Sequence, residues 1–220
     1  MCFSATASFI TAGVTGAIGL AALAQTRDLR ELPLAAMPLL FAGQQAVEGG
    51  LWLTLTEPAA TASPTLLTYA FLAIALVVWP LFAPTAALLV EADRARRRII
   101  QACLLIGVAV AAYFIATVLN VPHTAVIKDG HVVYRTGVEA PEAIGGIYLV
   151  ATAIALIVSS HRAVALLGAV VFVGSLATYL LYREAFVSVW CFFAAVASIV
   201  VLTHFIRARR AESRAAAGPR

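Results

Sequence analysis

The stretch that decides the fold is PTLLTYAFLAIALVVWPLFAPTAALLVEADRARRR, residues 64–98. Residues 64–90 carry no charged side chain, and a helix of about 20 apolar residues crosses the hydrocarbon core of a bilayer. The arginines within residues 91–98 are typical of a helix that ends on the cytoplasmic side of a membrane. Trp79-Pro80 and Pro84 predict a kink in this helix, because proline lacks the backbone N–H that a helical hydrogen bond needs.

The composition of the whole chain also indicates a membrane protein. Of its 220 residues, 62% are hydrophobic and 12% are charged, whereas soluble domains have about 25% charged residues. A chain this apolar cannot bury its hydrophobic surface in one water-soluble core. The net charge of +4 does not indicate nucleic acid binding, because the basic residues flank apolar segments and have no aromatic residues between them.

Seven apolar stretches are long enough to cross a membrane as helices. The predicted spans are Ser4–Ala24, Leu32–Leu55, Pro64–Val90, Ile99–Leu119, Ala143–Val158, Ala163–Leu181 and Ala185–Ile206.

Basic residues gather in alternate connections between these spans. Twelve of the fifteen Lys and Arg residues lie in QTRDLRE (residues 25–31), EADRARRR (91–98), SSHR (159–162) and RARRAESRAAAGPR (207–220). The other connections hold Lys128, Arg135 and Arg183. The positive-inside rule then places the N-terminus outside and the C-terminus in the cytoplasm. We therefore expect an all-α membrane protein, a seven-transmembrane-helix bundle with one membrane domain (1–206) and a basic cytoplasmic tail (207–220).

The loop between the fourth and fifth spans, residues 120–142, contains a hairpin pattern. Asp129-Gly130 separates two β-branched runs, which is a strong signal for a two-residue turn. The sequence predicts strands at Thr124–Lys128 and His131–Arg135 on the outer side of the membrane. Two interpretations remain open: an ornament that closes a long loop, or a lid over the outer end of the bundle.

The second predicted span carries polar residues in AGQQAVEGGLW, residues 42–52. Helical periodicity places Gln45, Glu48 and Trp52 on one stripe in the outer half of the span, with Gln44 at its edge. A carboxylate in the membrane interior is costly, so Glu48 should face the inside of the bundle. It is either a packed neutral acid bonded to Gln45, or a ligand, proton acceptor or counter-ion.

Two cysteines, one in the first block of the chain and one in the last span, lie on the outer side of the predicted bundle. Cys2 precedes the first span, and Cys191 shares a face with Ser188 in the outer half of the seventh span, AFVSVWCFFAA (185–195). The pair Cys2 and Cys191 forms a structural disulfide, packs as two free thiols, or acts as a redox couple or as soft-metal ligands with Glu48 or His123. Metal-ligand candidates are therefore Glu48, Cys2, Cys191 and His123.

Four further side chains have simpler interpretations. Trp190 is expected to anchor the outer membrane interface, and Cys103 to be an inert packing residue. The residues around Ser4 and Ser8 allow close helix contact, and their hydroxyls are placed to donate to Glu48.

Three blocks of the sequence together resemble a widespread family of uncharacterised bacterial integral membrane proteins, a domain of unknown function. The blocks are MCFSATASF (residues 1–9), LPLAAMPLLFAGQQAVEGGLW (32–52) and VWCFFAA (189–195), with Trp79-Pro80 between the second and third. The resemblance covers nearly the whole chain and implies a small multi-pass membrane protein. It implies no reaction. The residues that match its blocks are Cys2, Ser4, Ser8, Gln45, Glu48, Trp52, Ser188, Trp190 and Cys191.

The sequence supports three functions. The first is a sensor or carrier in the cytoplasmic membrane that binds a small ligand or metal in a polar cavity in the outer half of the bundle. The residues expected to line this cavity are Gln45, Glu48, Trp52, Ser188, Cys191, Cys2 and Ser4. The second is a membrane enzyme that acts on a lipid or redox partner at the outer leaflet, with Glu48 or the thiols as reactive groups. The third is a structural or assembly protein with a disulfide-stapled N-terminus. Membrane lipid is the expected partner, and the sequence identifies no cofactor.

Overall fold

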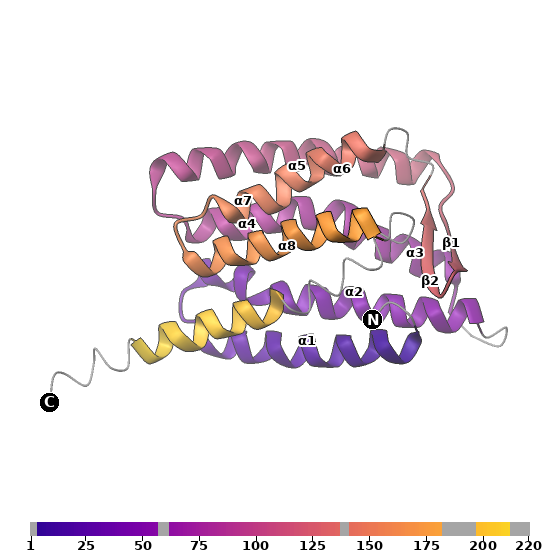
Figure 1. The fold of residues 1–220 in the computed structure, drawn as a ribbon, viewed down its shortest axis with the longest axis horizontal. Coiled ribbons are helices and arrows are strands. Elements are labelled where there is room, and N and C mark those ends of the chain that lie inside the picture. Colours follow the sequence, from indigo (N-terminus) through magenta and orange to yellow (C-terminus); the bar gives the residue numbers. More distant parts are fainter. Residues whose placement is uncertain (1–3, 57–61, 137–140, 182–196, 212–220) are drawn as a thin grey trace, which may run out of the picture.

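A computed structural model describes residues 4–56, 62–136, 141–181 and 197–211 as a bundle of helices that lie side by side, with a small β-hairpin at one end (Figure 1). The elements, in chain order, are α1 (Ala5–Gln25), η1 (Leu29–Glu31), α2 (Leu32–Thr56), α3 (Pro64–Leu72), η2 (Ala73–Val78), α4 (Trp79–Val90), α5 (Arg94–Asn120), β1 (Thr124–Lys128), β2 (His131–Arg135), α6 (Pro141–Leu149), η3 (Val150–Ile154), α7 (Ala155–Ile157) and α8 (Arg162–Leu181). Residues 197–211 are also helical.

The first six predicted spans agree with observed helices to within a few residues, with α3, η2 and α4 making up the third and α6, η3 and α7 the fifth. Of the seventh predicted span, only residues 197–206 are described, and these are helical. Apolar periodicity therefore located the helices well.

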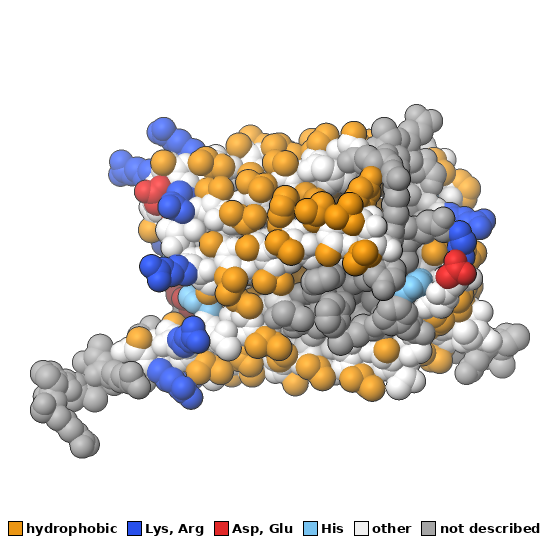
Figure 2. Space-filling model, viewed as in Figure 1, with side chains coloured by type: hydrophobic (Ala, Val, Ile, Leu, Met, Phe, Trp, Pro, Cys, Tyr) orange, Lys and Arg blue, Asp and Glu red, His pale blue; other side chains and the backbone are white. Residues whose placement is uncertain are grey.

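Four helical segments in the described part of the chain are long and apolar enough to cross a membrane. They are Ala5–Gln25, Pro64–Val90, Arg94–Asn120 and Arg162–Leu181, and a shorter apolar segment covers Ala143–Ile157. Hydrophobic side chains cover the flank of the bundle, while Lys and Arg side chains gather mainly at the end opposite the hairpin (Figure 2). These features indicate a membrane protein.

The prolines of the third predicted span lie beside a π-helical turn. The Trp79 backbone N–H bonds to the carbonyl of Ile74, five residues back, where an α-helix would use the fourth. This wider turn, η2, ends directly before Trp79-Pro80. It makes the helix irregular at the place where the sequence predicts a kink. A Cβ on Gly107 of α5 would overlap the Pro80 carbonyl oxygen, so glycine permits this close helix crossing.

The hairpin forms as predicted, with β1 antiparallel to β2 and Lys128 opposite His131. Asp129 and Gly130 have φ values of 50° and 75°, as the primed hairpin turn requires. Ala125 and Val132 pack with Leu51 and Trp52 of α2 in one buried cluster. The hairpin thus covers one end of α2, and we call this end of the molecule the hairpin end.

Two aromatic stacks fix the hairpin to α3. Tyr134 stacks on Phe71 with ring centroids 4.5 Å apart, and His123 stacks on Tyr69 at 5.6 Å. The Tyr69 hydroxyl also accepts a hydrogen bond from the His123 backbone N–H at 3.3 Å. In this structure the hairpin is a docked cap rather than an isolated loop.

At the opposite end, which we call the basic end, arginines bind helix carboxyl termini. Arg96 donates to the Val158 carbonyl at 2.7 Å, Arg97 to that of Leu88 at 2.8 Å, and Arg209 to that of Ala24 at 3.1 Å. Carbonyls at the end of a helix lack intrahelical partners and carry partial negative charge. These three arginines therefore join neighbouring helices, which goes beyond the predicted role of orienting the chain.

Candidate functional site: a buried polar seam on α1 and α2

The site begins with the packing of α1 against α2. A Cβ on Gly49 would lie 2.9 Å from the Phe9 ring, one on Gly16 would lie 3.6 Å from Ala42, and one on Gly19 would lie 2.9 Å from the Leu39 backbone nitrogen. Higher numbers on α1 face lower numbers on α2, so the helices are antiparallel and touch along most of their length.

This register brings two polar residues to the same side of the helix pair. Ser8 precedes Phe9, and Glu48 precedes Gly49, which lies against Phe9. One residue turns a helix by about 100°, and in antiparallel helices this step turns both side chains toward the same flank. Ser8 and Glu48 are both fully buried, so this flank lies inside the bundle.

Other polar residues continue this flank along both helices. Thr11 and Thr15 follow Ser8 at helical spacing, and Gln45 and Trp52 flank Glu48 in the same way. All of these side chains are buried. We call this group the polar seam: Ser8, Thr11, Thr15, Gln44, Gln45, Glu48 and Trp52.

Within the seam, several hydrogen bonds are made. Gln45 donates through Nε2 to Oε2 of Glu48 at 3.1 Å, as the i, i+3 spacing predicts. Gln44 accepts from Nε1 of Trp79 at 2.8 Å, which links α2 to α4. Thr15 donates to the Thr11 carbonyl at 2.8 Å.

Within the part of the chain that the structure describes, three polar atoms of the seam have no hydrogen-bond partner although they are sealed from solvent. They are Ser8 Oγ, Gln45 Oε1 and Trp52 Nε1. Leaving such a group unsatisfied costs about 1–3 kcal/mol, and native proteins have few of them. Three unsatisfied polar atoms along neighbouring turns of two paired helices indicate that the seam has a role other than helix packing.

The structure places the predicted site residues in different parts of the molecule, and some of them lie outside the described residues. Gln45, Glu48 and Trp52 lie together in the seam, whereas Ser4 caps α1 by accepting from the Ala7 N–H at 3.2 Å. His123 is buried beside Tyr69 at the hairpin. Cys2, Ser188, Trp190 and Cys191 lie outside the described residues, so the disulfide and the thiol ligands stay predictions. Cys103 is buried in the main core cluster, as expected of a packing residue.

No group of three or more His, Cys, Asp and Glu side chains is placed to hold a metal ion within the described ranges. The metal prediction for Glu48 and His123 therefore depends on Cys2 and Cys191.

Sequence reasoning missed Thr11, Thr15 and the Trp79–Gln44 contact. The threonines could have been found from their spacing, since Ser4, Ser8, Thr11 and Thr15 recur every three or four residues. The contact between Trp79 and Gln44 joins residues 35 positions apart and has no signal in one sequence.

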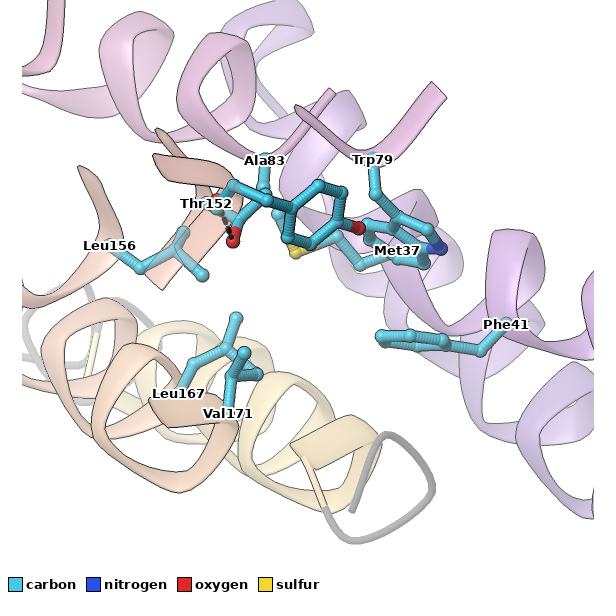
Figure 3. Close-up of a pocket in the computed structure, with 9 residues that line it drawn as sticks. Met37, Phe41, Trp79, Ala83, Thr152, Leu156, Leu167 and Val171 are labelled. Atoms are coloured by element: carbon cyan, nitrogen blue, oxygen red, sulfur yellow. Dashed lines mark hydrogen bonds between the residues drawn. The ribbon is translucent and has the colours of Figure 1, made fainter. Parts of the chain in front are cut away.

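A small cavity lies next to the seam on its basic-end side. It has a volume of about 20 Å³, roughly the room that one water needs, and Met37 and Phe41 of α2 line it together with Trp79, on which the Phe41 ring stacks at 4.1 Å (Figure 3). Leu167 and Val171 of α8 close another side. The cavity that the sequence predicts around Glu48 is not this one, because its lining is apolar and does not include Glu48 or Gln45.

A second buried acid, Glu91, has a structural explanation at the basic end. Its carboxylate accepts from the Ser160 N–H at 2.6 Å, from the Ser160 hydroxyl at 2.7 Å and from the Asp93 N–H at 2.9 Å. Burial raises the pKa of Glu91, but these bonds and one from Ser159 outweigh burial and lower the pKa to about 2. Glu91 therefore joins two loops, and its carboxylate has its hydrogen-bond partners, unlike Ser8 Oγ, Gln45 Oε1 and Trp52 Nε1 of the seam.

The bundle, its apolar flank and its segregated arginines define a helical membrane protein. The chain belongs to DUF6629, a family of unknown function, whose model matches residues 1–217. This confirms the resemblance to a domain of unknown function. No curated protein matches the chain, and no solved structure matches it.

Proposed function

We propose that this protein is a multi-pass membrane protein that binds a small molecule at the polar seam and acts as a sensor or carrier. The observation that carries the proposal is the set of unsatisfied atoms Ser8 Oγ, Gln45 Oε1 and Trp52 Nε1 beside the buried Glu48. Polar and ionisable groups in membrane helices usually mark a functional site, because their burial is costly.

The proposal includes seven membrane-spanning segments. α2 is 25 residues long and packs along α1, which is long and apolar enough to cross, so a membrane around α1 also surrounds α2. The segment Ala143–Ile157 is short, but α6, η3 and α7, which make up this part of the chain, all pack against α5. α5 is itself a candidate span. The seventh segment includes the helical residues 197–206, and the helix continues into the basic tail.

The proposed orientation puts the basic end in the cytoplasm and the hairpin end outside. Twelve of the fifteen Lys and Arg residues belong to the connections and tail at the basic end. The positive-inside rule applied to a bacterial host gives a protein of the cytoplasmic membrane with its C-terminus in the cytoplasm.

The two rival functions have less support from the described residues. An enzyme needs a reactive group at a surface that substrate reaches, whereas Ser8 and Glu48 are sealed. An assembly protein needs no unsatisfied polar atoms inside its bundle. The assembly function depends on Cys2 and Cys191, and the enzyme depends on these thiols or on Glu48 as a reactive group. The unsatisfied seam atoms depend on neither cysteine.

Identification of co-purified molecules tests the proposal. The wild type, Glu48→Gln and Glu91→Gln are purified in nanodiscs, extracted, and analysed for small molecules and metals by mass spectrometry. Glu91→Gln is the matched control, because it removes a buried carboxylate that already has its hydrogen-bond partners. We expect a small molecule in the wild type and the control, and its loss in Glu48→Gln.

The same contents in all three proteins would contradict the proposal. A metal that disappears with Glu48→Gln would support the metal form of the site instead.

A further inference from the structure

The three unsatisfied atoms of the seam specify what chemistry their partner has. The indole Nε1 of Trp52 only donates, so it needs an acceptor. Oε1 of Gln45 only accepts, and Nε2 of the same amide already donates to Glu48, so Oε1 needs a donor. A metal cation cannot accept from Trp52, and a simple anion cannot donate to Gln45. Water does both.

The seam also has a direction. Ala5, at the start of α1, packs against the cluster of Trp52 and the hairpin, while Ala24 near its end binds Arg209 at the basic end. Ser8, Thr11 and Thr15 therefore lie at increasing depth from the hairpin end. On α2, which runs the other way, Trp52, Glu48 and Gln44 lie in the same order of depth.

The seam is closed in this structure. Ser8 and Glu48 have no exposed surface, and the three unsatisfied atoms are out of reach of solvent. A closed arrangement that leaves three polar groups without partners is held at a cost, and a hydrated arrangement removes this cost.

We infer that the polar seam opens at the hairpin end and admits water past Ser8 to Glu48, and from there toward Thr11 and Thr15. This inference rests on the proposed function in treating Glu48 as part of the site, and it adds the route by which water reaches that site. The seam then delivers protons and water to a buried acid from one side of the membrane.

Cysteine accessibility in nanodiscs tests the route, because both ends of the molecule are in contact with water there. Ser8→Cys, Thr11→Cys and Thr15→Cys are treated with a charged methanethiosulfonate, and each modified peptide is quantified by mass spectrometry, so that native cysteines do not interfere. Ile10→Cys and Val14→Cys are the controls, since these α1 positions are exposed on the apolar flank, at 62% and 54%.

The seam cysteines should react at least about tenfold faster than the controls, because the reactive thiolate forms only where water reaches it. Their rates should fall from Ser8→Cys to Thr15→Cys. Seam rates as low as the controls would overturn the inference, as would rates that rise toward Thr15→Cys.

Hydroxyl-radical footprinting of the wild type gives a second test that needs no variant. Trp52 should be oxidised faster than Trp79, which is also buried but whose Nε1 already bonds to Gln44. Equal oxidation would contradict a hydrated seam.

The two proposals fail separately. If the seam labels and nothing co-purifies, the sensor or carrier function fails and the water route stands. If a molecule co-purifies and the seam does not label, the water route fails alone.

Discussion

At the scale of single residues, two tryptophans differ in one respect that the structure makes clear. Trp52 and Trp79 are both buried, with exposed fractions of 6% and 3%. Nε1 of Trp79 donates to Gln44 at 2.8 Å, and Nε1 of Trp52 has no partner. A hydrogen bond whose loss leaves the other group buried and unsatisfied is expensive to remove, whereas an unmade bond costs nothing to lose.

Trp79→Phe should therefore destabilise the protein by about 1–3 kcal/mol more than Trp52→Phe, because it leaves Gln44 without the indole donor. Both changes remove the same atoms, so the loss of volume is matched. Thermal unfolding in detergent measures the difference. Equal losses of stability would show that removing the Trp52 N–H also leaves a buried group of the chain without its partner.

At the scale of elements, Glu91 joins the loop before α5 to the loop before α8. Its carboxylate accepts from both Ser160 groups and from Ser159, while His161 Nε2 lies 2.9 Å from the Val90 carbonyl oxygen. Burial raises the pKa of Glu91, but the hydrogen bonds from Ser160, the Asp93 N–H and Ser159 stabilise the ionised acid and lower the pKa from its usual value of 4.5 to about 2. A lowered pKa in the folded state contributes stability above the unfolded-state pKa, and this stability is lost as the pH falls through the folded-state value.

Glu91→Gln should therefore be less stable than the wild type at pH 7, by about 2–3 kcal/mol for a buried, charge-assisted network. Between pH 5 and pH 2 the wild type should lose this advantage, and the two melting curves should converge. Melting temperatures across this range test the expectation. A constant difference at every pH would mean that the charge on Glu91 has no part in joining the loops.

Much of the fold at this scale follows from local pattern. Apolar run lengths gave the helices, and Asp129-Gly130 gave the hairpin and its register, because both are determined within short stretches. The π-helical turns η2 and η3 were not predicted. Both turns pack against α5, and a contact between distant segments has no signal in the local sequence pattern. The arginine contacts to helix carbonyls were missed for the same reason.

The site was predicted only in part. Spacing alone placed Gln45 beside Glu48, and the structure confirms that hydrogen bond. The alignment of Ser8 with Glu48 depends on the register between α1 and α2, which glycines at Gly16, Gly19 and Gly49 determine through close contact. The periodicity of one helix carries no information about how that helix is aligned with another.

At the scale of the whole molecule, charge and apolar surface are arranged along one axis. Arginines gather at the basic end, the hairpin closes the other, and apolar side chains cover the flank between them (Figure 2). The proposed orientation follows from this asymmetry.

Cysteine labelling in right-side-out membrane vesicles tests the orientation. Asp129→Cys in the hairpin turn should react with an impermeant reagent, whereas Ala92→Cys at the basic end should react only after the vesicles are opened. Both positions are exposed, so access differs only by side. Labelling of Ala92→Cys in sealed vesicles, with Asp129→Cys protected, would reverse the topology.

The most direct measurement is a high-resolution cryo-electron microscopy map of the protein in nanodiscs, examined around the polar seam. We predict non-protein density within hydrogen-bonding distance of Ser8 Oγ, Gln45 Oε1 and Trp52 Nε1, since these sealed atoms lack partners among the described residues. A map in which side chains of the protein itself satisfy all three atoms, with no further density, would contradict the account.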